Sequence, residues 1–137
     1  MWSPNLILWS LTFLLGSAPL STPIELSVGV VQVRGDLTLS GGGALRFNGS
    51  YGPAAGVSGR FECYVSAVEA ELVGPRLVTR RVLGRASPPE DGSRTFALRA
   101  SGVRPNHYIM AACGRMGRDD VPVSAEVKMF KIRDIMH

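Results

Sequence analysis

Histidine is the side chain best suited to acid–base and zinc chemistry near neutral pH, and the chain contains two, His107 and His137. A serine-hydrolase triad or a zinc site requires an imidazole that converges with further partner side chains. A single histidine beside a strand is more typical of a structural role. We therefore predict neither a catalytic site nor a metal site on these residues.

Sequence motifs for other chemistry are also missing. The chain has no G-x-S-x-G, H-E-x-x-H or C-x-x-C pattern, and Ser40-Gly-Gly-Gly43 lacks the Lys-Ser/Thr pair and helix of a phosphate loop. Two acidic pairs, Glu90-Asp91 and Asp119-Asp120, could hold a weak calcium ion, but few other oxygen ligands lie nearby, which favours solvated turns. We expect a protein without a cofactor that is not an enzyme.

The two cysteines, Cys63 and Cys113, each lie in an apolar, strand-like run. In an oxidising compartment, the simplest arrangement is one intramolecular disulfide between them. Closing a loop of about 50 residues contributes roughly 4 kcal/mol in the chain-entropy model. Two buried free thiols and an intermolecular bridge are the alternatives.

The N-terminus predicts entry into the secretory pathway. The apolar block from Leu6 to Leu15 is too short to span a bilayer, and the small residues Gly16, Ser17 and Ala18 follow it. We interpret residues 1–21 as a signal peptide cleaved near 18–21, which leaves one domain over residues 22–137. The block has no preceding Lys or Arg, so a buried N-terminal helix or an uncleaved anchor is the alternative.

A glycosylation signal agrees with this compartment. Asn48-Gly-Ser50 fits the acceptor pattern and is expected to lie in a Gly-rich turn. No later segment is apolar enough to span a membrane, so we expect no stable membrane insertion after cleavage. The predicted location is outside the cell or in the lumen of the secretory pathway.

Hydrophobic alternation predicts about seven or eight short strands separated by Gly- and Pro-rich turns, without a convincing helix. The first runs over 24–33 with a bulge at Gly29, followed by a turn at Gly35-Asp36. The strand over 60–73 changes phase at Ala67-Val68, which indicates a bend or bulge. The last, over 121–133, is expected to point inward with Val123, Ala125, Val127 and Met129. The predicted fold is an all-β, antiparallel two-sheet β-sandwich.

The stretch from Gly92 to Cys113 combines a strand, a Pro-Asn corner and a second strand. It resembles the corner of fibronectin type III-like sandwiches, and the ending of transthyretin-like and carboxypeptidase-regulatory-like sandwiches, in a pattern carried by Asp91, Gly92, Phe96, Val103, Pro105 and Tyr108. The resemblance implies a β-sandwich and covers about a sixth of the chain.

Two features could meet a partner. Tyr51 is expected to be exposed in a loop over 49–58. The stretch over 76–85 is expected to form an edge strand, because its arginines fall on both faces: Arg76, Arg80, Arg81 and Arg85. Together with the formal net charge of +4, these guanidinium groups suit sulfate or phosphate, so a sulfated glycan is a possible ligand. Charges that only protect a sheet edge are the alternative.

The leading hypothesis is a small secreted, glycosylated, non-enzymatic β-sandwich that acts by protein–protein recognition. A lumenal subunit of a secretory-pathway membrane complex has the same architecture. A carrier that holds an apolar ligand between the sheets is an alternative, and so is a sulfated-glycan binder that uses the Arg-rich edge. Nucleic acid is not expected as a partner, because a secreted chain without interleaved aromatic and basic residues lacks the usual surface for it.

Overall fold

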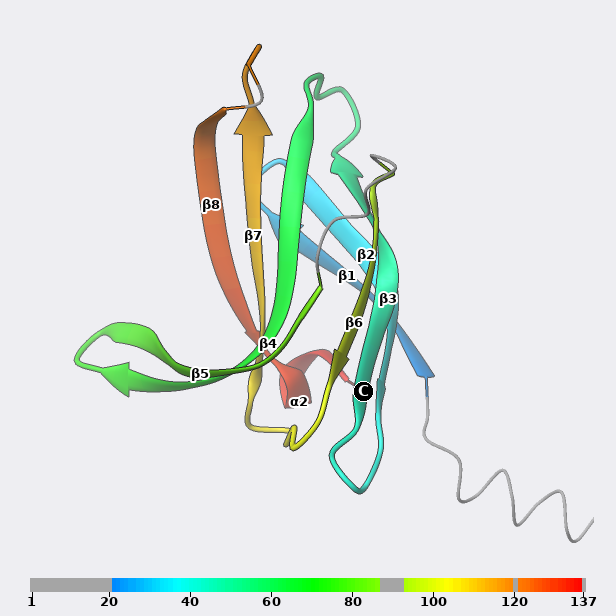
Figure 1. Cartoon of the computed structure of the whole chain (residues 1–137), viewed down its shortest axis with the longest axis vertical. Coiled ribbons are helices and arrows are strands. Elements are labelled where there is room, and N and C mark those ends of the chain that lie inside the picture. The colour runs from blue at the N-terminus through cyan, green and yellow to red at the C-terminus, as the bar shows by residue number, and fades with distance from the viewer. Residues whose placement is uncertain (1–20, 87–92, 120, 137) are drawn as a thin grey trace, which may run out of the picture.

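The computed structural model describes residues 21–86, 93–119 and 121–136, and it shows two antiparallel sheets of four strands each (Figure 1). The predicted all-β two-sheet sandwich is confirmed, with eight strands in the described residues. The elements are β1 (Ser21–Val28), β2 (Val31–Leu39), β3 (Leu45–Pro53), β4 (Phe61–Val73), β5 (Arg76–Ala86), β6 (Thr95–Ala100), β7 (Tyr108–Met116), β8 (Pro122–Lys131) and the one-turn helix α2 (Ile132–Ile135).

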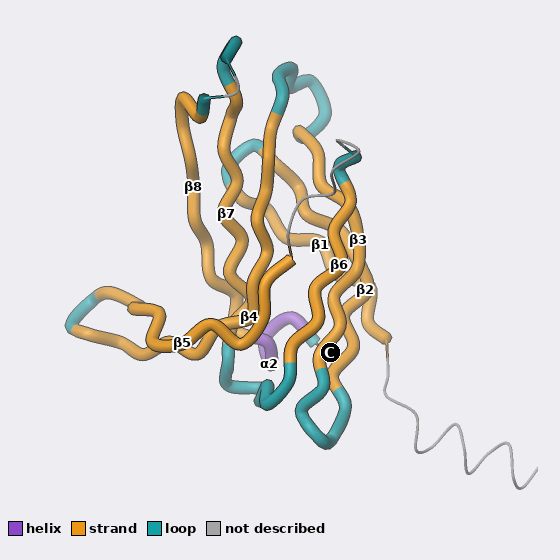
Figure 2. Tube along the Cα trace, in the orientation of Figure 1, coloured by secondary structure: helices purple, strands orange, loops and turns teal. Residues whose placement is uncertain are grey.

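The chain crosses between the two sheets three times. Sheet A has the order β1-β2-β3-β6 and sheet B the order β5-β4-β7-β8. The first three strands form a meander, β4 and β5 form a hairpin in sheet B, and β6 returns to pair with β3 before β7 and β8 complete sheet B. The tube in Figure 2 shows the two layers and the connections between them. This leaves β1 and β6 as the edges of sheet A, and β5 and β8 as the edges of sheet B.

The core lies between the sheets and is built mainly from alternating strand positions, together with Ile132 of α2. Its largest fully buried side chains are Phe47, Leu37, Leu45, Leu98, Ile109, Ile132, Val28, Val33, Val65 and Val68. Phe47 and Phe96 meet edge to face, with ring centroids 4.9 Å apart. All these residues except Val68 belong to one contiguous core cluster or pack within it.

A pair of glycines allows β2 and β3 to approach under these rings. Gly35 lies directly opposite Gly49, on the inner face of sheet A. A Cβ on Gly35 would lie 2.8 Å from the Phe47 ring, and a Cβ on Gly49 would overlap the carbonyl oxygen of Arg34. The missing side chain of Gly35 therefore provides space that Phe47 fills, and that of Gly49 allows the two backbones to approach.

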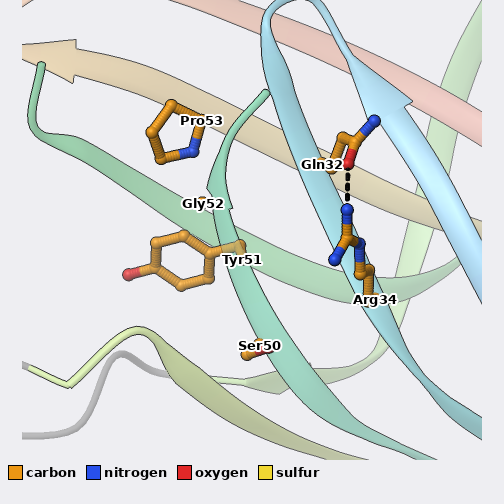
Figure 3. A pocket seen from close by; sticks show the side chains of 6 residues that line it. All are labelled: Gln32, Arg34, Ser50, Tyr51, Gly52 and Pro53. Atoms are coloured by element: carbon orange, nitrogen blue, oxygen red, sulfur yellow. Dashed lines mark hydrogen bonds between the residues drawn. The ribbon is translucent and has the colours of Figure 1, made fainter. Parts of the chain in front are cut away.

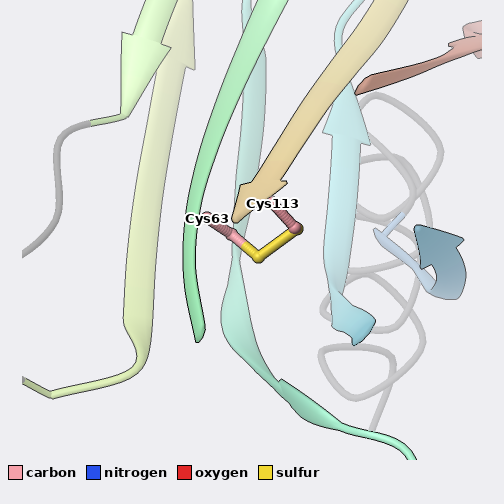
Figure 4. The surroundings of a disulfide bond; sticks show 2 residues. All are labelled: Cys63 and Cys113. Carbon is pink, nitrogen blue, oxygen red and sulfur yellow. A yellow bond between two sulfur atoms is a disulfide. The ribbon is translucent and has the colours of Figure 1, made fainter. Parts of the chain in front are cut away.

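The predicted disulfide is confirmed: Cys63 and Cys113 are bonded and lie directly opposite one another on β4 and β7 (Figure 4). Their Cα atoms are 4.1 Å apart, as expected for closely spaced residues of neighbouring antiparallel strands. The two residues are 2% and 5% exposed, so the bond is part of the inner face of sheet B. It closes a loop with a sequence separation of 50.

Two local predictions near the N-terminus, a bulge and a turn, are wrong. Gly29 is not a bulge: it begins a tight turn, with φ 61°, and Val28 pairs with Val31 across that turn. Gly35-Asp36 is not a turn but lies within β2. The apolar alternation pauses at Gly29-Val30 because the chain reverses there, whereas Gly35 continues the strand in phase beneath an aromatic ring.

The predicted irregularity in the long strand is confirmed. The pairing of β4 with β5 shifts between Ala67 and Val68, and again between Glu69 and Ala70. Beyond these bulges the β4–β5 hairpin leaves the sandwich and projects from its lower end (Figure 1). Val68 is fully buried without belonging to the core cluster, so the inner phase of β4 ends at Ala67.

The predicted orientation of β8 is wrong. Val127 pairs with Ala112 and Met129 pairs with Met110, which alternate with the buried residues of β7 and so face outward. Ser124, Glu126 and Lys128 occupy the inner side instead, and the Glu126 carboxylate lies close to Gly29 in the β1–β2 turn. Alternation separates the two faces of a strand but does not show which face the core will use.

Removing the disulfide should lower the stability of the protein but leave its strand arrangement unchanged. With both Cys63→Ala and Cys113→Ala, we expect the free energy of unfolding to fall by about 4 kcal/mol, because the unfolded chain regains the entropy of an open loop. Urea titration followed by circular dichroism measures this difference. As a control, mild reductant applied to the native protein should leave the buried disulfide intact. Equal urea midpoints for the double variant and the wild type would contradict the prediction.

The glycine pair gives a matched test of close strand approach. Gly49→Ala should destabilise by about 1–3 kcal/mol, because its methyl group has no space beside the Arg34 carbonyl. Gly52→Ala in the same strand is the control, since a Cβ there meets no atom within 4 Å. Thermal midpoints that fall equally in the two variants would show that close approach is not the cause.

Candidate recognition surface

The outer face of sheet A is polar along its whole width. Cross-strand rows place charged and hydroxyl side chains there, and Arg34 Nε lies 3.7 Å from Glu25 Oε1 on neighbouring strands. The face is formed mainly by Glu25, Ser27, Gln32, Arg34, Asp36, Thr38, Arg46, Asn48, Ser50, Thr95 and Arg99. A surface of this composition is well hydrated and offers little apolar area to a partner.

Asn48 lies in the middle of this polar face, between Asp36 on β2 and Ala97 on β6. Its predicted position in a Gly-rich turn is wrong, because β3 continues through Gly49 and Gly52 to Pro53. The side chain is nevertheless exposed. A glycan on Asn48 would project from sheet A without displacing the core.

The outer face of sheet B has the opposite character. Tyr64, Ala112 and Val127 form one cross-strand row, and Met110 and Met129 lie in the next. Tyr64 is 52% exposed and Val127 is 58% exposed. We define the apolar face of sheet B as Tyr64, Met110, Ala112, Ala125, Val127 and Met129.

Tyr64 is held in place on this face by a neighbour on its own strand. Its hydroxyl donates a hydrogen bond to Glu62 Oε1 at 2.9 Å. This hydrogen bond to the carboxylate raises the pKa of the Tyr64 phenol above its usual value, with smaller contributions from desolvation and from the negative charge. The hydrogen bond to Glu62 favours one orientation of the Tyr64 side chain.

The projecting hairpin is apolar on one face and at its tip. Leu72 and Leu77 pair across it, and Leu72 is 72% exposed next to Val73, which is 49% exposed. The tip is the Gly74-Pro75 turn, where Gly74 has φ 62°. At the base, Thr79 Oγ1 lies 4.0 Å from Met110 Sδ, so the hairpin joins the apolar face of sheet B.

The arginines of β5 do not act as four free cations. Arg80 Nε donates to Glu71 Oε1 at 2.8 Å, and Arg81 Nη2 lies 3.0 Å from Glu69 Oε2. These pairs join the two strands of the hairpin on its charged face. Arg76 and Arg85 are exposed at opposite ends of β5. The predicted edge position of this strand is confirmed, since β5 begins the order of sheet B.

Tyr51 is not the exposed loop residue that the sequence predicts. It lies in β3, is 7% exposed and belongs to the core cluster. A shallow hollow of about 190 Å³ lies beside it, and Figure 3 shows the Arg34 side chain directed at Gln32 while the Tyr51 ring points away from both. The flanking glycines suggested a loop, but β3 continues through them and directs the ring inward.

His107 has the structural role that the sequence predicts. It is buried at the β6–β7 corner, where its Nδ1 accepts a hydrogen bond from the Arg104 N–H at 3.0 Å. The His107 carbonyl accepts from the Ile132 N–H at 2.9 Å, which attaches α2 to the corner. Within the described ranges no group of three or more His, Cys, Asp or Glu side chains could hold a metal ion.

Several predicted features lie outside the described residues. They are residues 1–20 of the predicted signal peptide (1–21), the acidic pair Glu90-Asp91, Asp120 and His137. The described part of the chain begins with β1 at Ser21, and the predicted cleavage near 18–21 stays a prediction. In the part of the chain that the structure describes, no helix is long and apolar enough to cross a bilayer.

No family model, curated protein or solved structure matches the chain. The resemblance to fibronectin type III-like or transthyretin-like domains therefore stays a prediction.

Glycosylation of Asn48 can be tested directly. The secreted wild-type protein should shift in gel mobility on endoglycosidase treatment, and Asn48→Gln and Ser50→Ala should each abolish that shift. Asn106→Gln is the matched control, because Asn106 is exposed but followed by His-Tyr. Secreted wild-type protein whose mobility is insensitive to the enzyme would contradict the prediction.

Proposed function

We propose that the protein is a secreted, glycosylated, non-enzymatic β-sandwich that recognises another protein through the apolar face of sheet B and the adjoining hairpin. The observation that carries this proposal is the contrast between the two outer faces. One sheet exposes a hydrated surface with a glycan acceptor, whereas the other exposes Tyr64, Val127 and the hairpin tip. Contiguous apolar area on a soluble domain is typical of an interaction site.

The composition of the face fits a protein partner. Tyr64 supplies a large amphipathic ring whose hydroxyl bonds to Glu62, and two half-buried methionines provide adaptable apolar contacts beside it. Small residues between them, such as Ala112, keep the surface flat enough for a broad contact. Arginines at the ends of β5 would form a polar rim next to the hairpin.

The other hypotheses have less support. A carrier requires space between the sheets, but the inner side chains pack into a single buried cluster. A sulfated-glycan site on β5 is weakened because Arg80 and Arg81 already have carboxylate partners. A lumenal subunit of a membrane complex would use the same apolar face, so it is one form of the proposed function.

A matched pair of substitutions tests the proposal. Ala112→Arg places an unpaired charge in the centre of the apolar face, and Ala97→Arg places the same side chain on the outer face of sheet A. Tagged chains secreted from cells of the native tissue are recovered with their bound proteins, and these are quantified. We expect Ala112→Arg to lower partner recovery by about tenfold or more, because a buried charge without a partner costs affinity.

Both variants should keep the wild-type thermal midpoint, which separates recognition from folding. Ala97→Arg should retain the bound proteins. Equal recovery of the same proteins by the two variants would show that the apolar face of sheet B is not the recognition surface.

A further inference from the structure

β8 is an edge strand that is exposed on both faces. Every residue from Pro122 to Lys128 is exposed, including Val123 at 66% and Val127 at 58%. It is the last strand of sheet B, so one of its edges has no strand partner within the described residues. We propose that this edge pairs antiparallel with β8 of a second copy of the chain, about a two-fold axis at Val127.

The hydrogen-bonding pattern identifies the backbone groups available at that edge. The Ile132 N–H donates to the His107 carbonyl at 2.9 Å, one step beyond the Tyr108–Lys131 pair. Hydrogen-bonded and non-hydrogen-bonded pairs alternate along an antiparallel ladder. The register of β7 and β8 does not shift between Tyr108 and Arg115, so every second pair counted from His107–Ile132 is hydrogen-bonded. The main-chain groups of Glu126 and Lys128 therefore point to β7, and those of Ala125, Val127 and Met129 point to the free edge.

The charges on β8 select one register among those that this pattern allows. An axis at Glu126 would place two carboxylates opposite each other, and an axis at Lys128 would do the same with two ammonium groups. An axis at Val127 places each Glu126 opposite Lys128 of the partner subunit, twice by symmetry. These residues occupy the closely spaced, non-hydrogen-bonded positions, where side chains across an antiparallel pair interact best.

The same register matches the apolar residues. Val127 would lie beside its own copy, and Ala125 would lie opposite Met129 of the partner subunit, all on the outer side of the sheet. The two apolar faces would then be continuous across one eight-stranded sheet. A self-complementary patch of this kind is the requirement for a two-fold symmetric dimer.

The projecting hairpin is also compatible with this arrangement. Figure 1 shows it reaching past the lower end of β8, near α2. Antiparallel pairing brings the lower end of one copy to the upper end of the other. The apolar hairpin tip at Leu72 would therefore approach the end of β8 that exposes Val123.

Cysteine cross-linking tests the axis position. Val127→Cys in the secreted full-length protein should form a disulfide-linked dimer on mild oxidation, detected on a non-reducing gel. Val123→Cys is the matched control: it is more exposed, but its copy would lie roughly 26 Å away along the strand, and it should stay monomeric. Cross-linking at both positions alike, or only at Val123, would overturn the proposed register.

Charge reversal tests the pairing itself by sedimentation over a concentration series. Glu126→Lys or Lys128→Glu alone should weaken dimerisation by about tenfold or more, because each places like charges opposite one another. The double variant, and an equimolar mixture of the two single variants, should restore the dimer. Monomeric wild type at every concentration, or a double variant as weak as the singles, would overturn the proposal. Protein recognition by the Ala112 surface is tested separately and does not depend on this result.

Discussion

The pairing of β4 with β7 is the contact on which the rest of the structure depends. These are the two central strands of sheet B, and the Cys63–Cys113 bond joins them at directly opposed positions. On the inner side, Val65, Ala67 and Ile109 complete the core against sheet A. On the outer side, the same two strands carry Tyr64 and Ala112. Fixing this pair therefore fixes both the core and the candidate recognition surface.

The bulges in β4 divide that strand into a segment that belongs to the sandwich and a segment that forms the projecting hairpin. Up to Val68 it pairs with β7 in the sandwich, and from Glu69 onward it builds a hairpin whose charged face is closed by Arg80–Glu71 and Arg81–Glu69 pairs. Each surface ion pair contributes at most about 1 kcal/mol. Their effect is better understood as fixing strand register in a hairpin that has no second sheet to pack against, which allows Leu72 to remain exposed at the tip.

The sequence predicts those features that depend on local alternation. The all-β fold, the phase change at Ala67-Val68 and the edge position of the Arg-rich strand all follow from it, and the disulfide follows from two cysteines in apolar runs. What fails is the choice of face or the extent of a strand. Tyr51 is buried because β3 continues through two glycines, and Val127 faces outward because the register of β8 places it opposite Ala112 of β7. The apolar face of sheet B could not be predicted, since it exists only when β4, β7 and β8 are in register.

The four sheet edges are protected in different ways, and this explains why β8 differs from the others. β5 is bulged and rich in arginine, and its end covers β6, where a Cβ on Gly84 would lie 2.7 Å from the Ala100 Cβ. β1 carries Pro23, which has no N–H to offer a neighbouring strand. β8 has Pro122 only at its start, and its Glu126 and Lys128 have opposite signs at the spacing that places them opposite each other in an antiparallel copy. The β8 edge is therefore protected against registers that place like charges opposite each other, but it remains able to pair in the register centred on Val127.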